Sequence, residues 1–226
     1  MKRSHLVILI VLLLGIAGGA VFLYLTRPLA APSETVSTPK TTNNTATGTT
    51  LTFSIDPTAS KATFEIFEVL SGQDKIVLGT TSQVTGSITV DKANPQNSTI
   101  TPVRVNARTF ITDSERRNAA IGRLILKSEE TANEFIVFTP KKMTSLPTMG
   151  VPGTAYTFKV TGDLTIAGVT KTATFDTTAT FNADNTVTGK ATGSVKRGDY
   201  NLIVPSLPFL ADVGEEVKLS FEFVAR

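Results

Sequence analysis

The side chains that most often carry catalysis are nearly absent from this chain of 226 residues. Cysteine does not occur, and the single histidine, His5, precedes an apolar run near the N-terminus. Beyond His5 the chain therefore lacks an imidazole or thiol for a general base, a catalytic triad or a transition-metal site. No acidic loop has the spacing of a calcium site either. These residue types argue against an enzyme and against a bound metal or other cofactor.

Acidic residues do occur as two close pairs that could be considered for acid–base chemistry. One pair is Glu65 and Glu68, and the other is Glu129 and Glu130. A pair of carboxylates indicates catalysis only when other groups of the site support it, and the neighbouring sequence supplies none. We interpret both pairs as solvated surface charges.

The net charge of +3 belongs to the N-terminal part of the chain. The first 50 residues hold four basic side chains and one acidic side chain, Glu34, which leaves 18 of each sign in residues 51–226. A nucleic-acid-binding domain normally carries a basic face of its own. The neutral balance of residues 51–226 therefore predicts that the chain does not bind nucleic acid.

An uncharged apolar run covers residues 6–25, with Lys2 and Arg3 before it and Arg27 after it. As a helix, twenty residues span roughly 30 Å, which is the thickness of the hydrocarbon core of a bilayer. Basic residues ahead of the run favour a cytoplasmic N-terminus. The pattern predicts a cytoplasmic tail at residues 1–5, a transmembrane signal anchor at residues 6–25, and an extracytoplasmic remainder in the periplasm or at the cell surface.

A cleaved signal peptide is the alternative interpretation of this run. Gly18, Gly19 and Ala20 are small residues of the kind found near a cleavage site. However, the apolar run continues through residues 21–25, and Tyr24 suits a residue at the membrane interface. We therefore favour an uncleaved anchor.

The next segment, residues 26–50, has the composition of a linker. It is rich in Thr, Pro, Ser, Ala and Asn, and its larger aliphatic residues are Leu29 and Val36. Such a segment buries too little apolar surface to offset the entropy of ordering, so we expect a disordered linker. A flexible coil of this length would hold the following domain roughly 25–30 Å from the membrane on average.

Alternating apolar and polar residues dominate the rest of the chain, residues 51–226. In residues 160–175 (VTGDLTIAGVTKTATF), alternation breaks at Ala167 and Gly168 and then resumes, which predicts a β-hairpin. Similar segments recur about eight times, and closing such strands into a barrel removes exposed sheet edges. We therefore predict one all-β domain, a closed antiparallel eight-stranded barrel. The other strand segments are residues 51–55, 62–67, 75–78, 84–90, 103–108, 134–139, 187–195 and 216–223.

One segment of this domain, residues 113–127, has helical rather than strand periodicity. Its first two residues are N-cap candidates, and Ile121 and Leu124 belong to an apolar set at helical spacing. Gly122 weakens a helix by roughly 1 kcal/mol relative to alanine, so we expect a short or irregular helix. Its apolar residues need a buried environment, and the mouth of the barrel provides one.

The strand at residues 187–195 presents unusually small residues on its predicted inner face. Gly189, Ala191 and Gly193 occupy successive inward positions. Glycine in a strand accompanies either a bend or bulge, or the close approach of another group to the backbone. A bend or bulge would be a purely structural feature, whereas the close approach of another group would mean that the small residues make room for a ligand. The sequence does not distinguish them.

Residues 160–171 resemble the signature segment of the YceI-like family, whose members are lipocalin-like periplasmic or secreted proteins that bind polyisoprenoid lipids. The resemblance extends over residues 51–226 and rests on the set of motifs rather than on any one of them. The other matching elements are Asp56 and Pro57, Phe64, residues 84–91 and 109–117, Phe138, residues 197–202 and residues 213–217.

The chain departs from the family pattern at positions where polar groups are usual. Ala167 stands where relatives carry histidine, and Asn118, Ala120 and Ile121 stand where they carry an acid followed by His-Leu. Asn201 replaces a glycine. The resemblance therefore implies an apolar container for an elongated isoprenoid-like or fatty-acyl lipid, without the polar groups of a specific head-group site.

We expect the lipid to be held by inward-facing residues of the barrel and by apolar residues at its mouth. The alternative for each residue is ordinary core packing, because a cavity wall and a filled core use the same residue types. A barrel with a packed lumen would instead be a structural or protein-interaction module of the cell envelope. Neither interpretation excludes a homodimer. The expected ligand-binding residues are Phe64, Ile66, Val105, Phe138, Phe158, Leu164, Phe175, Ala191 and Phe221, with Ile121, Leu124, Leu207 and Phe209 at the mouth.

Overall fold

The computed structural model describes residues 27–34, 50–205 and 210–226. The anchor predicted at residues 6–25 lies outside these residues, as do two of the expected mouth residues, Leu207 and Phe209. Of the helices within the described part of the chain, none is long and apolar enough to cross a membrane.

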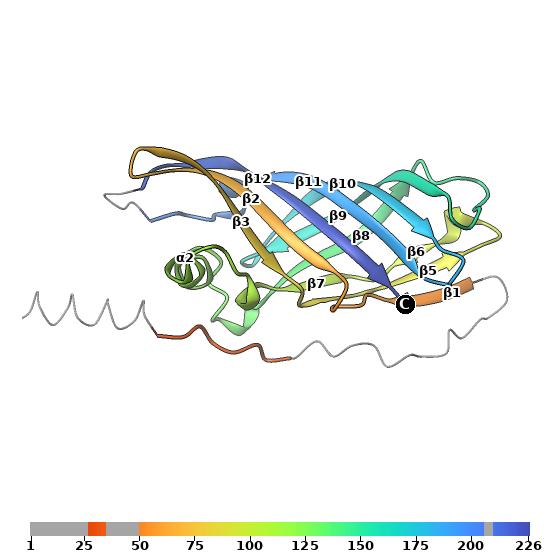
Figure 1. The fold of residues 1–226 in the computed structure, drawn as a ribbon, viewed down its shortest axis with the longest axis horizontal. Coiled ribbons are helices and arrows are strands. Elements are labelled where there is room, and N and C mark those ends of the chain that lie inside the picture. The colour runs from red at the N-terminus through yellow and green to blue at the C-terminus, as the bar shows by residue number, and fades with distance from the viewer. Residues whose placement is uncertain (1–26, 35–49, 206–209) are drawn as a thin grey trace, which may run out of the picture.

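Within the described residues, nine strands form one antiparallel sheet that curls around an apolar interior (Figure 1). Their order across the sheet is β3-β2-β12-β11-β10-β9-β8-β7-β4. The strands are β2 (Lys61–Leu70), β3 (Gln73–Thr81), β4 (Val84–Thr85), β7 (Val103–Asn106), β8 (Phe135–Thr144), β9 (Ala155–Ile166), β10 (Val169–Phe181), β11 (Val187–Lys196) and β12 (Leu210–Ala225).

A smaller antiparallel sheet, in the order β1-β5-β6, covers one end of the curled sheet. It lies opposite to the end that carries α2 (Figure 1). Phe53 of this sheet is fully buried, and its ring lies 5.9 Å from the ring of Phe181. The bounds are β1 (Thr50–Ser54), β5 (Ser87–Asp91) and β6 (Thr99–Ile100), and the helical turns are η1 (Pro95–Asn97), η2 (Ala107–Thr109), α2 (Glu115–Ala120), η3 (Ile121–Ile125), η4 (Thr131–Asn133) and η5 (Arg197–Tyr200).

The large sheet differs from the expected closed ring of eight strands. Its edge strands are β3 and β4, and no ladder joins them in the described part of the chain. Instead β3 meets the segment before α2 at one bridge, where Thr80 and Ile111 exchange two N–H···O bonds of 2.9 Å. The segment at residues 84–91, expected as one strand, divides between the two sheets as β4 and β5. The ring stays open because β5 leaves the large sheet to pair with β1.

The hairpin predicted at residues 160–175 is confirmed as β9 and β10. Val160 pairs with Phe175 and Gly162 with Ala173, so the inward faces of the two strands are those that the alternation indicates. Ala167 and Gly168 form the turn with φ angles of 47° and 78°. Positive φ at both central residues is the signature of the two-residue turn that matches the twist of a hairpin.

The short or irregular helix predicted around Gly122 is confirmed as α2 followed by η3. Ser114 caps α2, because its side chain accepts a hydrogen bond from the Arg117 N–H. η3 is a π-helical turn in which the Leu126 N–H donates to the Ile121 carbonyl at 2.8 Å. Turns of this kind are rare and are frequently found at functional sites.

The small residues of β11 accommodate neighbouring aromatic rings. The ladder between β11 and β12 runs without a register shift, which excludes a bulge at this position. A Cβ atom at Gly189 would lie 2.6 Å from the Phe223 ring, and one at Gly193 would lie 3.0 Å from the Phe175 ring. Both glycines therefore let a phenylalanine ring lie against the backbone, while Ala191 between them faces the interior.

Gly162 of β9 packs closely against the backbone of β8, and this packing can be tested by substitution. A Cβ atom there would lie 2.3 Å from the Thr139 carbonyl oxygen, next to the irregular register at Pro140. Because backbone atoms cannot move aside cheaply, we expect Gly162→Ala to destabilise the domain by about 1–3 kcal/mol. Thermal or urea unfolding of the two proteins measures this loss.

Gly150 provides the matched control for this substitution. A Cβ atom at Gly150 would lie 3.5 Å from Pro95, which is an ordinary contact distance. Gly150→Ala should therefore leave stability nearly unchanged. Equal losses for the two alanine variants would contradict this description of the β8–β9 packing.

Candidate ligand-binding cavity

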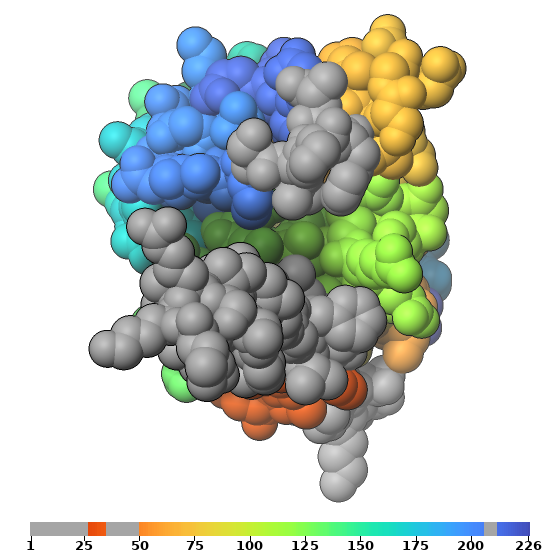
Figure 2. Space-filling model, turned by 90° about the vertical axis from the view of Figure 1, so that its left-hand side faces the viewer, coloured from red at the N-terminus to blue at the C-terminus, as the bar shows by residue number. Residues whose placement is uncertain are grey.

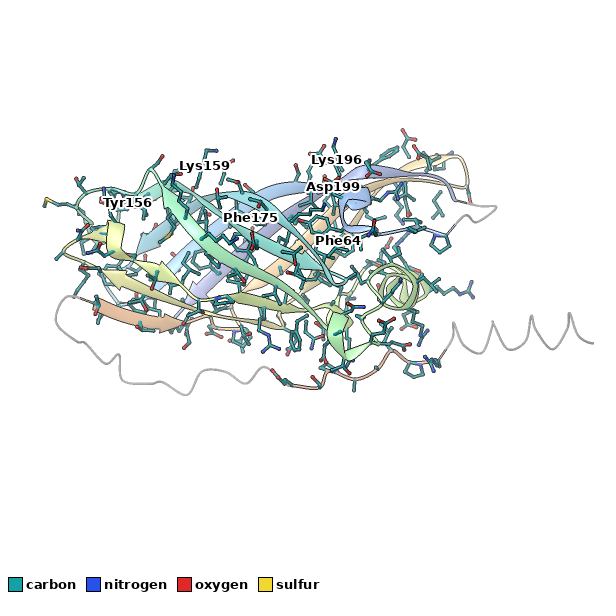
Figure 3. All side chains as sticks on the ribbon, turned by 180° about the vertical axis from the view of Figure 1, so that it is seen from behind. Phe64, Tyr156, Lys159, Phe175, Lys196 and Asp199 are labelled. Atoms are coloured by element: carbon teal, nitrogen blue, oxygen red, sulfur yellow. The ribbon has the colours of Figure 1, made fainter. Side chains whose placement is uncertain are left out.

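A cavity of about 1060 Å³ lies inside the curled sheet. Every second residue of the long strands faces it, so that Phe64 and Phe175 lie inside the sheet while Lys159 and Lys196 point away from it (Figure 3). Packed protein interiors hold few voids larger than a water molecule. The interior of the sheet is therefore hollow rather than a filled core.

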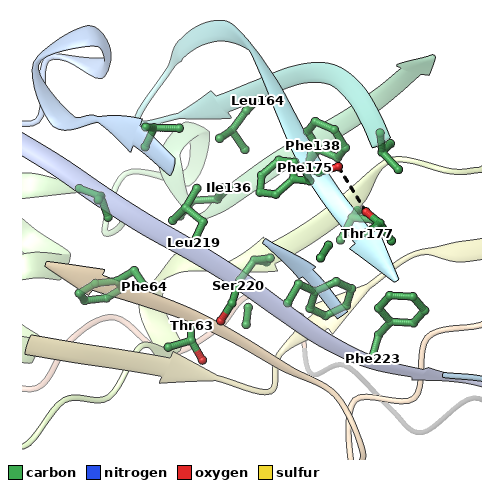
Figure 4. Close-up of a pocket in the computed structure, with 18 of the residues that line it drawn as sticks. Thr63, Phe64, Ile136, Phe138, Leu164, Phe175, Thr177, Leu219, Ser220 and Phe223 are labelled. Carbon is green, nitrogen blue, oxygen red and sulfur yellow. Dashed lines mark hydrogen bonds between the residues drawn. The ribbon is translucent and has the colours of Figure 1, made fainter. Parts of the chain in front are cut away.

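Phenylalanine rings form the middle part of the cavity wall. The rings of Phe138 and Phe175 meet edge to face with centroids 4.9 Å apart (Figure 4), and Phe64 meets Phe110 in the same way at 5.3 Å. Edge-to-face pairs are favourable beyond their buried area. Each ring is thus held by a partner in the wall, which fixes the shape of the apolar surface that faces the cavity.

The structure brings together all the expected ligand-binding residues that it describes. Eleven of the thirteen line the cavity, and Leu207 and Phe209 lie outside the described residues. Contact of any of the thirteen residues with a lipid stays a prediction. The eleven lining residues are Phe64, Ile66, Val105, Ile121, Leu124, Phe138, Phe158, Leu164, Phe175, Ala191 and Phe221.

The cavity extends along the sheet from one end of the domain to the other. At one end it is lined by α2 and η3, including Ile121 and Leu124, and by the segment after η5. We call this end the mouth. At the opposite end it reaches Pro95, Met143 and Tyr156. An elongated ligand therefore suits this cavity better than a compact one.

A buried ion pair at the mouth was missed by the sequence analysis. Arg117 Nη2 lies 2.7 Å from Glu68 Oε1, and both residues line the cavity. Interpreting Glu68 as a solvated charge was wrong, because it follows Phe64 and Ile66 on the inner face of β2 and is buried. The alternation of β2 could have placed it there. Among the described residues, no group of three or more histidine, cysteine, aspartate or glutamate side chains could hold a metal ion.

Residues 27–34, which we call the strap, lie on the outer surface at the end of the domain that carries α2, at the lower edge of Figure 2. The Arg123 side chain is fully buried and its Nη2 donates to the carbonyls of Arg27 and Pro28. The Glu129 carboxylate forms two ion pairs: its Oε2 lies 2.6 Å from Arg27 Nη2, and its Oε1 lies 3.1 Å from Arg123 Nε. The interpretation of Glu129 as a solvated surface charge was therefore wrong as well.

A second buried cluster holds the other half of the strap. Arg108 Nη1 donates to the Ala31 carbonyl at 2.9 Å, and Glu134 Oε1 accepts from the Ser33 N–H at 2.7 Å. Glu134 also accepts from Asn106 Nδ2 at 2.9 Å, and its Oε2 forms an ion pair with Arg108 Nη1 at 3.0 Å. Part of the segment expected to be a linker is therefore in contact with the domain, because buried side chains bind its backbone at Arg27, Pro28, Ala31 and Ser33.

The strap contacts lower the pKa of the Glu134 carboxyl. Burial alone would raise this pKa, but the hydrogen bonds from Ser33 and Asn106 and the charge of Arg108 together outweigh it. A carboxyl whose pKa is lower in the folded state stabilises the fold above its unfolded-state pKa, about 4.3. That contribution is lost as the pH falls through the lowered pKa.

We therefore expect the stability difference between the wild type and Glu134→Gln to depend on pH. The difference should be constant from pH 7 to about 5 and should shrink below the unfolded-state pKa of about 4.3. Urea unfolding of both proteins across this range measures it. A difference that stays constant down to pH 3 would contradict a role for the ionised carboxylate.

Comparison with known proteins identifies related sequences and folds. The sequence profile of the YceI-like domain matches residues 53–225. Burkholderia cenocepacia BcnA is similar in structure, with a TM-score of 0.60 and 19% identity over 76% of this chain and 99% of that chain. No curated protein matches the chain.

Two further solved structures share the fold. A polyisoprenoid-binding domain from Saccharophagus degradans, implicated in plant cell wall breakdown, has a TM-score of 0.59 and 14% identity over 77% of this chain and 97% of that chain. The Campylobacter jejuni YCEI protein has a TM-score of 0.51 and 21% identity over 65% of this chain and 82% of that chain. At these identities the likeness concerns the fold alone.

Proposed function

Because the chain belongs to the YceI-like domain family, we propose that it binds or transports an elongated apolar lipid, a polyisoprenoid or an acyl chain, while tethered to a membrane. The observation that carries this proposal is the apolar cavity of about 1060 Å³ along the curled sheet. Its volume is slightly above the roughly 300–1000 Å³ range of small-molecule sites. The domain is proposed to bind its ligand without catalysing a reaction.

The chemistry of the wall favours a long hydrocarbon chain. Each buried CH2 group contributes about 0.8 kcal/mol, so a long chain needs no polar contact to bind. The Saccharophagus degradans domain, described as polyisoprenoid-binding, supports an isoprenoid among such chains. In this proposal the curled sheet encloses the lipid chain, and the segment around Ile111 borders the open edge of the sheet at β3.

The proposed membrane tether rests on the sequence. The uncharged run at residues 6–25 is long enough to span a bilayer, and the basic residues before it favour an extracytoplasmic domain. N-terminal sequencing of the mature protein tests the tether. We expect the first residues of the chain to be retained, and a mature N-terminus after residue 20 would overturn this part of the proposal.

A series of ligands with increasing chain length tests the binding function. We expect the affinity of saturated and isoprenoid alcohols to rise with each added carbon, by up to about 0.8 kcal/mol per CH2, until the cavity is filled. Competition with a fluorescent polyene fatty acid measures these affinities. Affinity that does not depend on chain length, or no binding at all, would overturn the proposal and favour the structural or protein-interaction module.

A further inference from the structure

The strap begins beside the mouth of the cavity, two residues after the run predicted to be a membrane anchor. Arg27 is fixed by Arg123 and Glu129, and the side chain of Leu29 lies against Gly122 of η3. A Cβ atom at Gly122 would lie 2.8 Å from Leu29, so the glycine makes this contact possible. The strap therefore begins on the outer surface of the same π-helical turn whose inner residues line the cavity.

The distance from the strap to the bilayer is short. The apolar run ends at Leu25, two residues before Arg27. Two extended residues span at most about 7 Å, whereas a free linker over residues 26–50 would allow roughly 25–30 Å on average. A bound strap would therefore keep the mouth closer to the end of such an anchor than a free linker would.

The surface around the mouth is suited to contact with lipid. Leu124 of η3 is 36% exposed and also lines the cavity. Ile203 is 73% exposed and lies between Leu202 and Val204, which line the cavity on the facing side of the mouth. Apolar side chains thus continue from the cavity wall onto the outer surface at this end.

We propose that the strap docks the mouth of the cavity onto the bilayer surface, so that a lipid chain passes between membrane and cavity without crossing water. This inference rests on the proposed function for its membrane anchor. The partner surface is the outer face of the lipid bilayer, since the anchor enters the membrane within two residues of the strap. The charge clusters around Arg108 and Arg123, which we call the clamp, bind the strap and thereby set this orientation.

The absence of cysteine allows a direct measurement of orientation. Single cysteines replace Leu124 and Ile203 at the mouth, and Met149 and Val151, which are 73% and 55% exposed near the opposite end, serve as matched controls. Each full-length variant is spin-labelled and reconstituted in phosphatidylcholine vesicles. The relative accessibility of the label to oxygen and to a water-soluble nickel chelate then reports its depth in the bilayer.

We expect both mouth labels to favour oxygen and both distal labels to favour the nickel chelate. A double variant, Leu29→Asp with Ser33→Pro, places a charge against Gly122 and removes the N–H that binds Glu134 without changing any residue of the sheet. It should abolish this difference, and Arg123→Ala, which removes the donor to the carbonyls of Arg27 and Pro28, should do the same. Equal accessibility at both ends, or a difference that persists in the double variant, would overturn the inference.

The outcome can be separated from that of the proposed function. Lipid affinity in the chain-length series does not require a fixed orientation, so binding without a depth difference would overturn only the strap inference. A depth difference without lipid binding would overturn the proposed function and leave the docked orientation standing.

Discussion

Ala191→Phe is expected to weaken the binding of a long-chain ligand by more than tenfold while leaving the domain folded. Ala191 faces the cavity between two glycines whose space is taken by the rings of Phe223 and Phe175. A ring at position 191 would enter open volume rather than packed atoms. Displacing even two CH2 groups of the ligand costs about 1.6 kcal/mol, which corresponds to more than tenfold in affinity.

The neighbouring outward residue supplies the control for this prediction. Thr192→Phe adds the same ring on the same strand, but Thr192 is exposed on the opposite face. Titration with a polyene fatty acid should show wild-type affinity for Thr192→Phe and loss for Ala191→Phe. If Ala191→Phe instead lowered stability by the roughly 1–3 kcal/mol of an over-packed core, the interior would be filled and the cavity would not be a binding site.

Arg108→Ala is expected to cause the largest loss of stability, about 3–5 kcal/mol. The side chains of Arg108 and Glu134 are 7% and 1% exposed, so removal of the arginine leaves a buried carboxylate without its cation. The substitution also removes the donors to the carbonyls of Ala31, Ser128 and Glu129. Urea unfolding of the wild type and the variant measures the loss.

An arginine four residues earlier tests whether burial is the cause. Arg104 pairs with Glu34 at 3.6 Å and lies over the Phe135 ring, but its side chain is 40% exposed. Exposed ion pairs and cation–π contacts contribute at most about 1 kcal/mol each. Losses of the same size for Arg104→Ala and Arg108→Ala would contradict the account of a buried clamp.

The inner face of the sheet could be predicted because it follows from local periodicity. Phe64, Leu164 and Phe221 face the cavity since strand side chains alternate, and that alternation is visible in the sequence. The same rule would have placed Glu68 inside, but its charge led to the opposite interpretation. Patterning thus predicted which residues face inward more reliably than residue type did.

The open edge and the strap could not be predicted in the same way. The chain from Val84 to Asp91 reads as one strand, and its division between two sheets depends on pairing with β1, more than thirty residues away. Arg108 and Arg123 bind strap carbonyls 77 to 96 residues distant in sequence. No local pattern marks an arginine that will bind backbone atoms so far along the chain, whereas the composition of residues 26–50 is that of a linker.

Native mass spectrometry of the full chain tests the central claim most directly. The protein is purified from its membranes in a detergent that is then removed by collisional activation, with Ala191→Phe analysed alongside. The account predicts that one long-chain lipid stays bound to the wild type and is absent from the variant. A wild-type chain that carries no lipid, or the same lipid mass on both proteins, would contradict the assignment of the cavity as a lipid-binding site.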